Sequence, residues 1–148
     1  MIADFFTNRI TLCVLTAFFA AETIKFIVEA FLTRDWSLRN FISSGGMPSS
    51  HTASVVSLAA AVGLTEGFDS PLFTACGVFA FVVMTDAAGV RRETGRQGSV
   101  INRIQQLIFG SDDDDDSVDM KERVGHSPLE VVIGAILGVL IALAFFAI

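Results

Sequence analysis

Residues 126–148 read HSPLEVVIGAILGVLIALAFFAI, and this stretch decides what kind of protein the chain forms. From Leu129 to Ile148 it is apolar except for Glu130 near its start. A helix of about 20 apolar residues is long enough to cross the hydrocarbon of a bilayer. Ser127 and Pro128 are typical of the first positions of a helix. The stretch therefore predicts a membrane-spanning helix that begins directly after His126.

The composition of the whole chain agrees with a membrane protein. Of its 148 residues, 52% are apolar and 18% are charged, whereas soluble domains have about 25% charged residues. The net charge is −6, but five of the sixteen acids form one run, Asp112–Asp116. This balance argues against a nucleic-acid-binding protein, which normally carries a basic face. The two cysteines, Cys13 and Cys76, lie in apolar stretches and indicate neither a disulfide framework nor a zinc site.

Two further segments, Ile10–Thr33 and Pro71–Val90, have the length and apolarity of membrane spans. A third, His51–Leu64, is shorter and follows a run of Gly, Pro and Ser at residues 45–50. Non-helical backbone at membrane depth is tolerated only when it is buried in protein or lines a wet cavity. We therefore expect an all-α integral membrane bundle, a single domain over residues 1–148. It has about four membrane-embedded helices, of which the second is short or re-entrant and borders a pocket.

The distribution of basic residues predicts the orientation of the chain. If the four segments cross in turn, one side of the membrane holds only Arg9. The other side holds Arg34, Arg39, Arg91, Arg92, Arg96, Arg103, Lys121 and Arg123. The positive-inside rule places this second side in the cytoplasm of a cell-membrane protein. A cleaved signal peptide over Leu12–Ala21 is the alternative for the N-terminus, although no net positive charge precedes it.

Residues 91–127 are mostly polar and are expected to form a loop. Within it, Val100–Phe109 carries apolar residues at helical spacing. This spacing predicts an amphipathic helix that lies on the membrane surface or covers the pocket. The run Asp112–Asp116 is interpreted as a solvated loop. A calcium or magnesium site is the alternative, although consecutive acids without a glycine turn form a poor cage.

The two histidines, His51 and His126, each stand at the start of a predicted helix. Ser49 and Ser50 precede His51 and can cap its helix, whose free backbone amides form an anion site. Glu130 lies four residues after His126. Its carboxylate can therefore reach one imidazole nitrogen and leave the other nitrogen free to attack. The alternative is that each histidine only caps a helix or packs.

Basic side chains near the same membrane face are candidates for binding an anion. Lys25 lies inside the first span, where a charge costs roughly 2.5–3.5 kcal/mol. It either pairs with Glu22 or Glu29 on the same helix or reaches an anion in the pocket. The arginines that suit phosphate oxygens, or that only anchor the cytoplasmic side, are Arg34, Arg39, Arg91 and Arg92. Asp86 precedes Arg91 by about one turn and is expected to hold Arg91 or Lys25 in place, in a structural role.

Two of these stretches resemble the motifs of a known family. Pro48–His51, which reads PSSH, resembles the Pro-Ser-Gly-His motif of the type 2 phosphatidic acid phosphatase superfamily, which also includes vanadium-dependent haloperoxidases. His126–Val131, which reads HSPLEV, resembles the His-x-x-x-Asp motif of the same superfamily. Three stretches look most similar to the small, divergent branch of that superfamily: residues 45–51, 86–92 and 125–128. The resemblance extends from Lys25 to Gly138.

The resemblance implies a role for each matching residue. His126 attacks phosphorus, and Glu130 orients it. His51 protonates the leaving oxygen and later deprotonates the water that releases phosphate. The phosphate-binding residues that it implies are Lys25, Ser49 and Ser50. It implies no metal or other cofactor.

The chain departs from the family pattern mainly in its arginines. The family has an Arg-Pro pair soon after its lysine, whereas Lys25 is followed by Arg34 and Arg39 at longer spacing and without proline. Met120 stands where the family has an arginine before the third motif. The arginines that could substitute are Arg91, Arg92 and Arg123. Two motif residues also differ, Ser50 in place of glycine and Glu130 in place of aspartate.

We therefore expect a membrane-embedded phosphatase that hydrolyses a phosphomonoester or pyrophosphate of a lipid through a phosphohistidine intermediate. Its expected partners are the lipid phosphate and the membrane, with no nucleic acid, and a second copy of the chain could help to enclose the site. The first alternative is a catalytically inactive membrane protein that binds an anionic headgroup or a partner. The second is vanadate-dependent peroxidase chemistry, which usually needs a rigid, enclosed site in a larger soluble protein.

Overall fold

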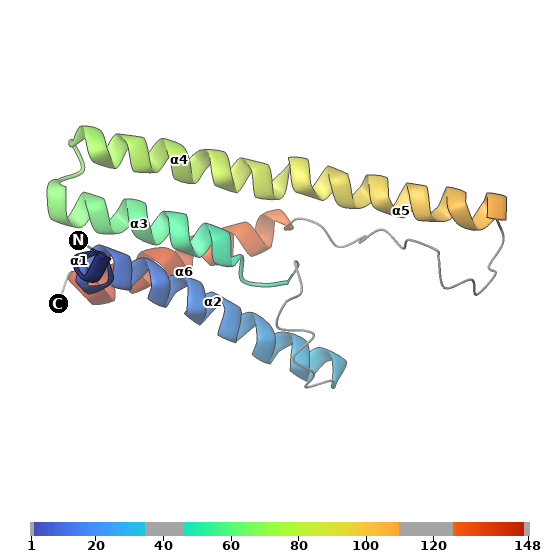
Figure 1. The fold of residues 1–148 in the computed structure, drawn as a ribbon, viewed down its shortest axis with the longest axis horizontal. Helices are drawn as coiled ribbons and strands as arrows, with labels where there is room; N and C mark the ends of the chain where they lie inside the picture. The colour runs from blue at the N-terminus through green and yellow to red at the C-terminus, as the bar shows by residue number, and fades with distance from the viewer. Residues whose placement is uncertain (1, 35–45, 110–125, 147–148) are drawn as a thin grey trace.

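The computed structural model describes residues 2–34, 46–109 and 126–146, and the regular secondary structure in these residues is helical (Figure 1). In chain order the helices are α1 (Ile2–Thr7), α2 (Arg9–Thr33), α3 (Ser50–Glu66), α4 (Pro71–Ala88), α5 (Val90–Phe109) and α6 (Pro128–Phe146). The predicted all-α class is confirmed.

Polar side chains define where the long helices begin. Asn8 Oδ1 accepts hydrogen bonds from the backbone N–H groups of Ile10 and Thr11 at 2.8 and 3.4 Å, and α2 starts there. Ser49 and Ser70 cap α3 and α4 in the same way. Such caps satisfy backbone donors that the first turn of a helix leaves unpaired. Short polar segments of the sequence therefore set the ends of the apolar helices.

α3 is the central helix, and it packs against α2, α4 and α6 (Figure 1). Its buried residues are mostly small: Ser50, Thr52, Ala53, Val55, Ser57, Ala59, Ala61, Val62 and Gly63. Small side chains let membrane helices approach closely, which matters because burial between helices yields little gain when the solvent is lipid. With 17 residues, α3 is shorter than the roughly 20 that span a bilayer. It is therefore short, as predicted, and it is continuous from Ser50 to Glu66.

Two glycines bring α6 against α3. A Cβ added to Gly134 would lie 2.6 Å from the carbonyl oxygen of Ser49, and one added to Gly138 would lie 2.6 Å from that of Ala53. The two glycines are four residues apart, so they lie on the same face of α6. Because only glycine leaves room for this approach, these positions determine how closely the beginnings of α6 and α3 lie.

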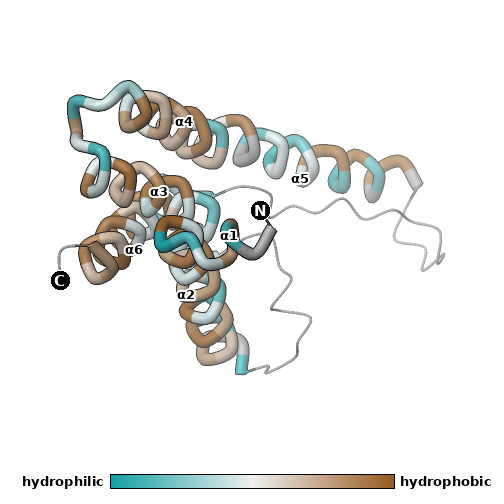
Figure 2. Tube along the Cα trace, turned by 60° about the vertical axis from the view of Figure 1, so that its left-hand side comes forward, coloured by the Kyte–Doolittle hydropathy of each residue, from teal (hydrophilic) through white to brown (hydrophobic). Residues whose placement is uncertain are grey.

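The outer surface of the bundle is apolar and suits a bilayer. Three stretches of the described helices are long and apolar enough to cross a membrane: Arg9–Phe31, one within Pro71–Gln105, and Pro128–Phe146. In α4 the buried residues are Ala80 and Ala87, whereas large side chains such as Phe79 and Phe81 are more than half exposed. In Figure 2, α4 and α6 are coloured mostly as hydrophobic along their length. The predicted membrane bundle is therefore confirmed.

The order of the helices brings the candidate site residues toward one end of the bundle. α2 and α4 end, and α3 and α6 begin, at the end from which α5 projects (Figure 1). The opposite end holds both chain termini. There Arg9 donates a hydrogen bond to the carbonyl oxygen of Phe145 and lies 5.1 Å from the centre of the Phe146 ring. Arg9 thus links the start of α2 to the end of α6, at the end of the bundle opposite the histidines.

α5 begins earlier than the sequence predicts. The apolar spacing indicated a helix only over Val100–Phe109, but α5 starts at Val90, directly after Gly89 at the end of α4. An apolar stripe marks where a helix has an apolar face, whereas helix formation itself continues through good helix formers such as Arg, Glu and Gln. Residues 91–99 are therefore helical where a loop was expected, and α5 runs nearly in line with α4 (Figure 1). The run Asp112–Asp116 lies outside the described residues.

Candidate functional site

His126 and Glu130 are in contact at the start of α6. His126 Nδ1 lies 2.9 Å from Glu130 Oε2, and the histidine is buried, with 7% of its surface exposed. A carboxylate at this distance assigns the proton to Nδ1, because Nδ1–H then donates to Oε2. The lone pair is left on Nε2, which is the nitrogen able to act as a nucleophile or base.

Glu130 also closes the first turn of α6. Ser127 Oγ accepts a hydrogen bond from the Glu130 backbone N–H at 3.3 Å, and Glu130 Oε2 accepts one from the Ser127 backbone N–H at 3.2 Å. This reciprocal pair is a capping box, which favours glutamate or glutamine at the third helical position. The glutamate that stands here in place of the family's aspartate therefore has a structural reason. Its carboxylate lies at the helix end that favours negative charge.

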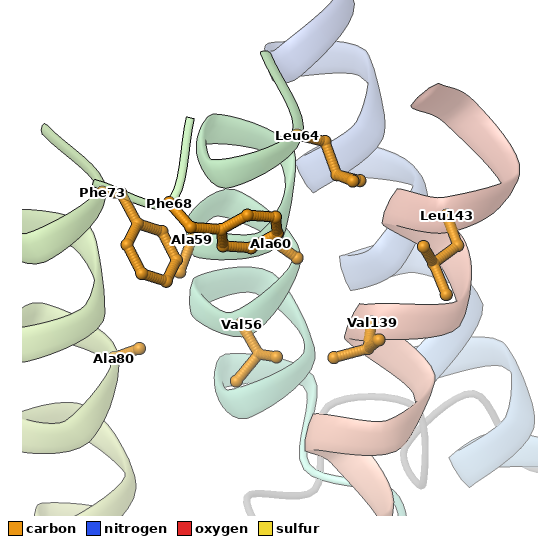
Figure 3. Close-up of a pocket in the computed structure, with 9 residues that line it drawn as sticks. All are labelled: Val56, Ala59, Ala60, Leu64, Phe68, Phe73, Ala80, Val139 and Leu143. Carbon is orange, nitrogen blue, oxygen red and sulfur yellow. The ribbon is translucent and has the colours of Figure 1, made fainter. Parts of the chain in front are cut away.

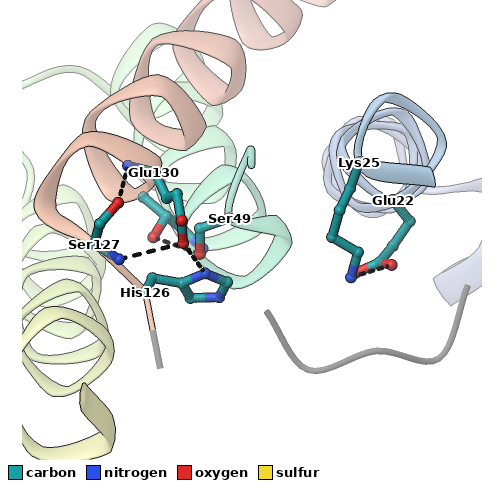
Figure 4. A network of polar contacts seen from close by, with 7 residues as sticks. Glu22, Lys25, Ser49, His126, Ser127 and Glu130 are labelled. Atoms are coloured by element: carbon teal, nitrogen blue, oxygen red, sulfur yellow. Dashed lines mark hydrogen bonds and ion pairs between the residues drawn. The ribbon is translucent and has the colours of Figure 1, made fainter. Parts of the chain in front are cut away.

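Backbone hydrogen bonds join this pair to two other helices. The His126 N–H donates to the carbonyl oxygen of Ala87 at the end of α4, at 3.0 Å. The Ser49 N–H donates to the carbonyl oxygen of Glu130, at 3.2 Å. Figure 4 shows Ser49 beside Glu130 and His126 as a result. The start of α6, the start of α3 and the end of α4 thus meet at the candidate nucleophile.

The start of α3 brings two serines and the second histidine close together in sequence and space. Ser49 is fully buried, and its Oγ accepts hydrogen bonds from the Thr52 backbone N–H at 3.4 Å and from the Thr52 hydroxyl at 3.1 Å. Ser50 is the buried first residue of α3, and the exposed His51 follows it. Backbone N–H groups at such a helix start suit an anion. Thr52 was missed by the sequence reasoning, although its place three residues after a capping serine is a signal for it.

Lys25 and Glu22 form a second polar cluster, on α2. Lys25 Nζ lies 2.8 Å from Glu22 Oε2, and the two residues are only 6% and 9% exposed. Gly46 lies against the lysine stem, since a Cβ there would be 2.9 Å from Lys25 Cγ, and its φ of +114° suits glycine. The segment that leads to Ser49 therefore passes beside Lys25. In Figure 4 this pair and the His126 cluster stand on separate helices, with the imidazole ring extending toward the side of the pair.

The other predicted residues stand at the same end of the bundle or outside the described residues. Arg34 is exposed at the C-terminal cap of α2, with a φ of 56°. Arg91 and Arg92 belong to the first turn of α5, and Asp86 is half-buried in the last turn of α4. Arg39 falls outside the described residues. Within the described ranges, no group of three or more His, Cys, Asp or Glu side chains is arranged to hold a metal ion.

These features define an all-helical membrane protein in which a buried histidine contacts a half-buried glutamate at one end of the bundle. The model of the Divergent PAP2 family matches residues 6–141, and the chain belongs to this family. It is also 38% identical over 152 residues to the uncharacterized membrane protein YuiD of Bacillus subtilis (strain 168), with 95% of each chain covered. No solved structure matches the chain. The resemblance carried by the sequence motifs is confirmed at the level of the family.

Proposed function

We propose that the protein is a membrane phosphatase that hydrolyses a lipid phosphomonoester or pyrophosphate through a phosphohistidine at His126. The observation that carries the proposal is the 2.9 Å contact between His126 Nδ1 and Glu130 Oε2, because it leaves Nε2 as a nucleophile of fixed orientation. Glu130 is itself held by the Ser127 backbone N–H. The imidazole is therefore oriented before substrate arrives, which is what an attacking group requires.

The reaction consists of two displacements at phosphorus. In the first, the His126 Nε2 lone pair forms a bond to phosphorus, the bond from phosphorus to the leaving oxygen breaks, and His51 gives a proton to that oxygen. In the second, His51 takes a proton from water, and the water oxygen bonds to phosphorus while the N–P bond breaks. Phosphate leaves, and both histidines regain their initial states. Glu130 acts as a positioning residue that also stabilises the positive charge on the imidazole.

Positive groups near the start of α3 would stabilise the charge on the transferring phosphoryl group. The buried Ser49 and Ser50 supply hydroxyl groups and belong to a helix start whose backbone N–H groups suit an anion. Lys25 would share its ammonium group between the phosphate and Glu22, to which it is now paired. The arginines proposed to complete the phosphate site are Arg34, Arg39, Arg91 and Arg92. Asp86 is proposed to support these cations.

The place of the site in the bundle supports an amphiphilic substrate. His126 precedes a membrane-spanning helix, so a headgroup can reach it at the membrane surface while the lipid tail stays in hydrocarbon. The predicted excess of basic residues at this end supports a cytoplasmic active face.

Headgroup binding without turnover is the second candidate function. The ion pair between Lys25 and Glu22 favours it, because a lysine already paired with a carboxylate stabilises the charge of a phosphoryl transition state less, whereas the helix start can still bind an anion. In this function the start of α3 holds the anion, and no bond to His126 forms.

Phosphate release by the purified protein in lipid nanodiscs separates the two candidates. We expect the wild type to release phosphate from phosphatidic acid or from a polyprenyl pyrophosphate. His126→Ala and His51→Ala should release none while they keep the wild-type circular dichroism spectrum and bind the same lipids. Arg96→Ala is the control, because Arg96 is exposed on α5 and pairs with Glu93. Full activity of His126→Ala would exclude the phosphohistidine, whereas lipid binding without any release by the wild type would favour the second candidate.

A further inference from the structure

An apolar groove of about 300 Å³ lies between α4 and α6, with α3 as its floor (Figure 3). Val56 and Ala60 of α3 form part of this floor, while Ala80 of α4 and Val139 and Leu143 of α6 form its sides. Its lining side chains are all apolar. An apolar cavity does not hold ordered water, because water needs polar partners. The groove therefore suits a hydrocarbon occupant.

The groove and the candidate site lie along the same three helices. The His126 N–H is bonded to Ala87, and Ala80 is seven residues earlier on α4, or about 10 Å along the helix. On α6, Val139 is nine residues beyond Glu130, or about 14 Å. Measured along the helix axes, the groove therefore begins about 10–14 Å from the level of His126.

Aromatic side chains stand at the far end of the groove. The rings of Phe68 and Phe73 pack edge to face with their centres 5.1 Å apart, at the turn between α3 and α4. Gly63 lies directly against Phe68, since a Cβ there would be 2.6 Å from the ring. In Figure 3 these rings lie at the opposite end from Val56 and Val139. The groove thus has a near end toward the starts of α3 and α6, at Val56 and Val139, and a far end formed by the two rings.

We propose that this groove binds the long hydrocarbon tail of the substrate while its phosphate lies at His126. The inference rests on the proposed phosphatase function and names the class of substrate, a phosphorylated lipid with a tail that extends well beyond 10 Å. A tail already surrounded by lipid gains little transfer free energy by entering the groove. The contribution of the groove is positional, because a held tail fixes the phosphorus opposite Nε2, and a misplacement of about 1 Å can cost as much as a hundredfold in rate.

Filling the near end of the groove tests the proposal. Val139→Phe adds a ring at a residue that is 40% exposed, so that folding is preserved. Val78→Phe is the matched control, since Val78 is a lipid-facing valine of α4, 60% exposed, that does not line the groove. We expect Val139→Phe to lower kcat/KM about tenfold or more for dioleoyl phosphatidic acid or a polyprenyl phosphate. Turnover of p-nitrophenyl phosphate, which has no tail, should be unchanged, and Val78→Phe should match the wild type with all three substrates.

A binding measurement keeps this inference distinguishable from the proposed function. Phosphatidic acid with a photoactivatable group in its tail should label residues of the groove in both the wild type and the inactive His126→Ala variant, and Val139→Phe should reduce this labelling. Equal labelling of Val78 and Val139, or an equal effect of Val139→Phe on substrates with and without a tail, would overturn the inference. Loss of a dimer in Val139→Phe with unchanged tail preference would also overturn it, because a second copy would then cover the groove. If the wild type hydrolyses no lipid phosphate, the proposed function fails, while the labelling still decides what the groove binds.

Discussion

In the proposed phosphatase, one carboxylate oxygen of Glu130 contributes to both stability and catalysis, and two substitutions can separate these effects. Its Oε2 accepts hydrogen bonds from the Ser127 backbone N–H at 3.2 Å and from His126 Nδ1 at 2.9 Å. Glu130→Gln keeps an oxygen that can accept from Ser127 but removes the negative charge. Glu130→Ala removes both the acceptor and the charge.

The expected magnitudes follow from these two contacts. Loss of a helix cap costs about 1 kcal/mol, and loss of a hydrogen bond to a charged group costs about 1.5–3 kcal/mol. Glu130→Ala should therefore destabilise the protein by about 2–4 kcal/mol and lower Tm by roughly 5–10 °C. Glu130→Gln should lower Tm by only about 2–4 °C. Because an imidazole without its carboxylate loses both its tautomer and the stabilisation of its positive charge, we expect either variant to lower kcat by about 10²–10⁴-fold.

Thermal unfolding followed by circular dichroism, together with initial rates of phosphate release, measures both quantities on the same preparation. Glu93→Gln is the matched control, because Glu93 is an exposed glutamate of α5 whose ion pair with Arg96 stands outside the site, and it should change neither Tm nor kcat. A wild-type kcat in Glu130→Gln would refute the reasoning. So would a loss of kcat that simply follows the loss of Tm in the two Glu130 variants.

Three further predictions concern packing and charge. Gly134→Ala should lower Tm by about 5 °C or more and reduce turnover, because its Cβ would lie 2.6 Å from a backbone oxygen of α3. Gly77→Ala is the control, because its Cβ meets nothing within 4 Å, and it should leave Tm unchanged or raise it. An equal decrease of Tm in the two variants would contradict the close approach of α6 to α3. Lys25→Met leaves the Glu22 charge buried and should cost about 3–5 kcal/mol in stability. The double variant Lys25→Met, Glu22→Gln should regain most of the wild-type Tm but no turnover. Full activity of this double variant would contradict the proposed role of Lys25 in binding phosphate. Arg9→Gln should lower Tm by about 2 °C and leave kcat unchanged, because Arg9 lies at the end of the bundle opposite the candidate site. A changed kcat would show that the two ends of the bundle are coupled.

Much of the candidate site was predictable from short stretches of sequence. The four-residue separation of His126 and Glu130 spans about one helical turn, so helix geometry alone brings the carboxylate to the imidazole. Ser49 was predicted as a cap because a serine after proline suits the start of a helix, and it caps α3. The partner of Lys25 was open between two glutamates on the same helix, both within one turn. The structure pairs Lys25 Nζ with Glu22 Oε2 at 2.8 Å, and the packing of Gly46 against the lysine stem had no signal in the sequence.

The sequence by itself determined that the chain is a membrane protein, where its spanning helices lie, and which two helix starts carry histidines. These properties depend on apolar length and on capping, and both act over a single turn or a single helix. Only the tertiary structure decided that α3 is the central helix, that the starts of α3 and α6 meet the end of α4, and that a groove remains between α4 and α6. These properties depend on how closely helices distant in sequence approach each other. That approach is limited by individual backbone contacts, such as those at Gly134 and Gly138, which no local pattern of residues specifies.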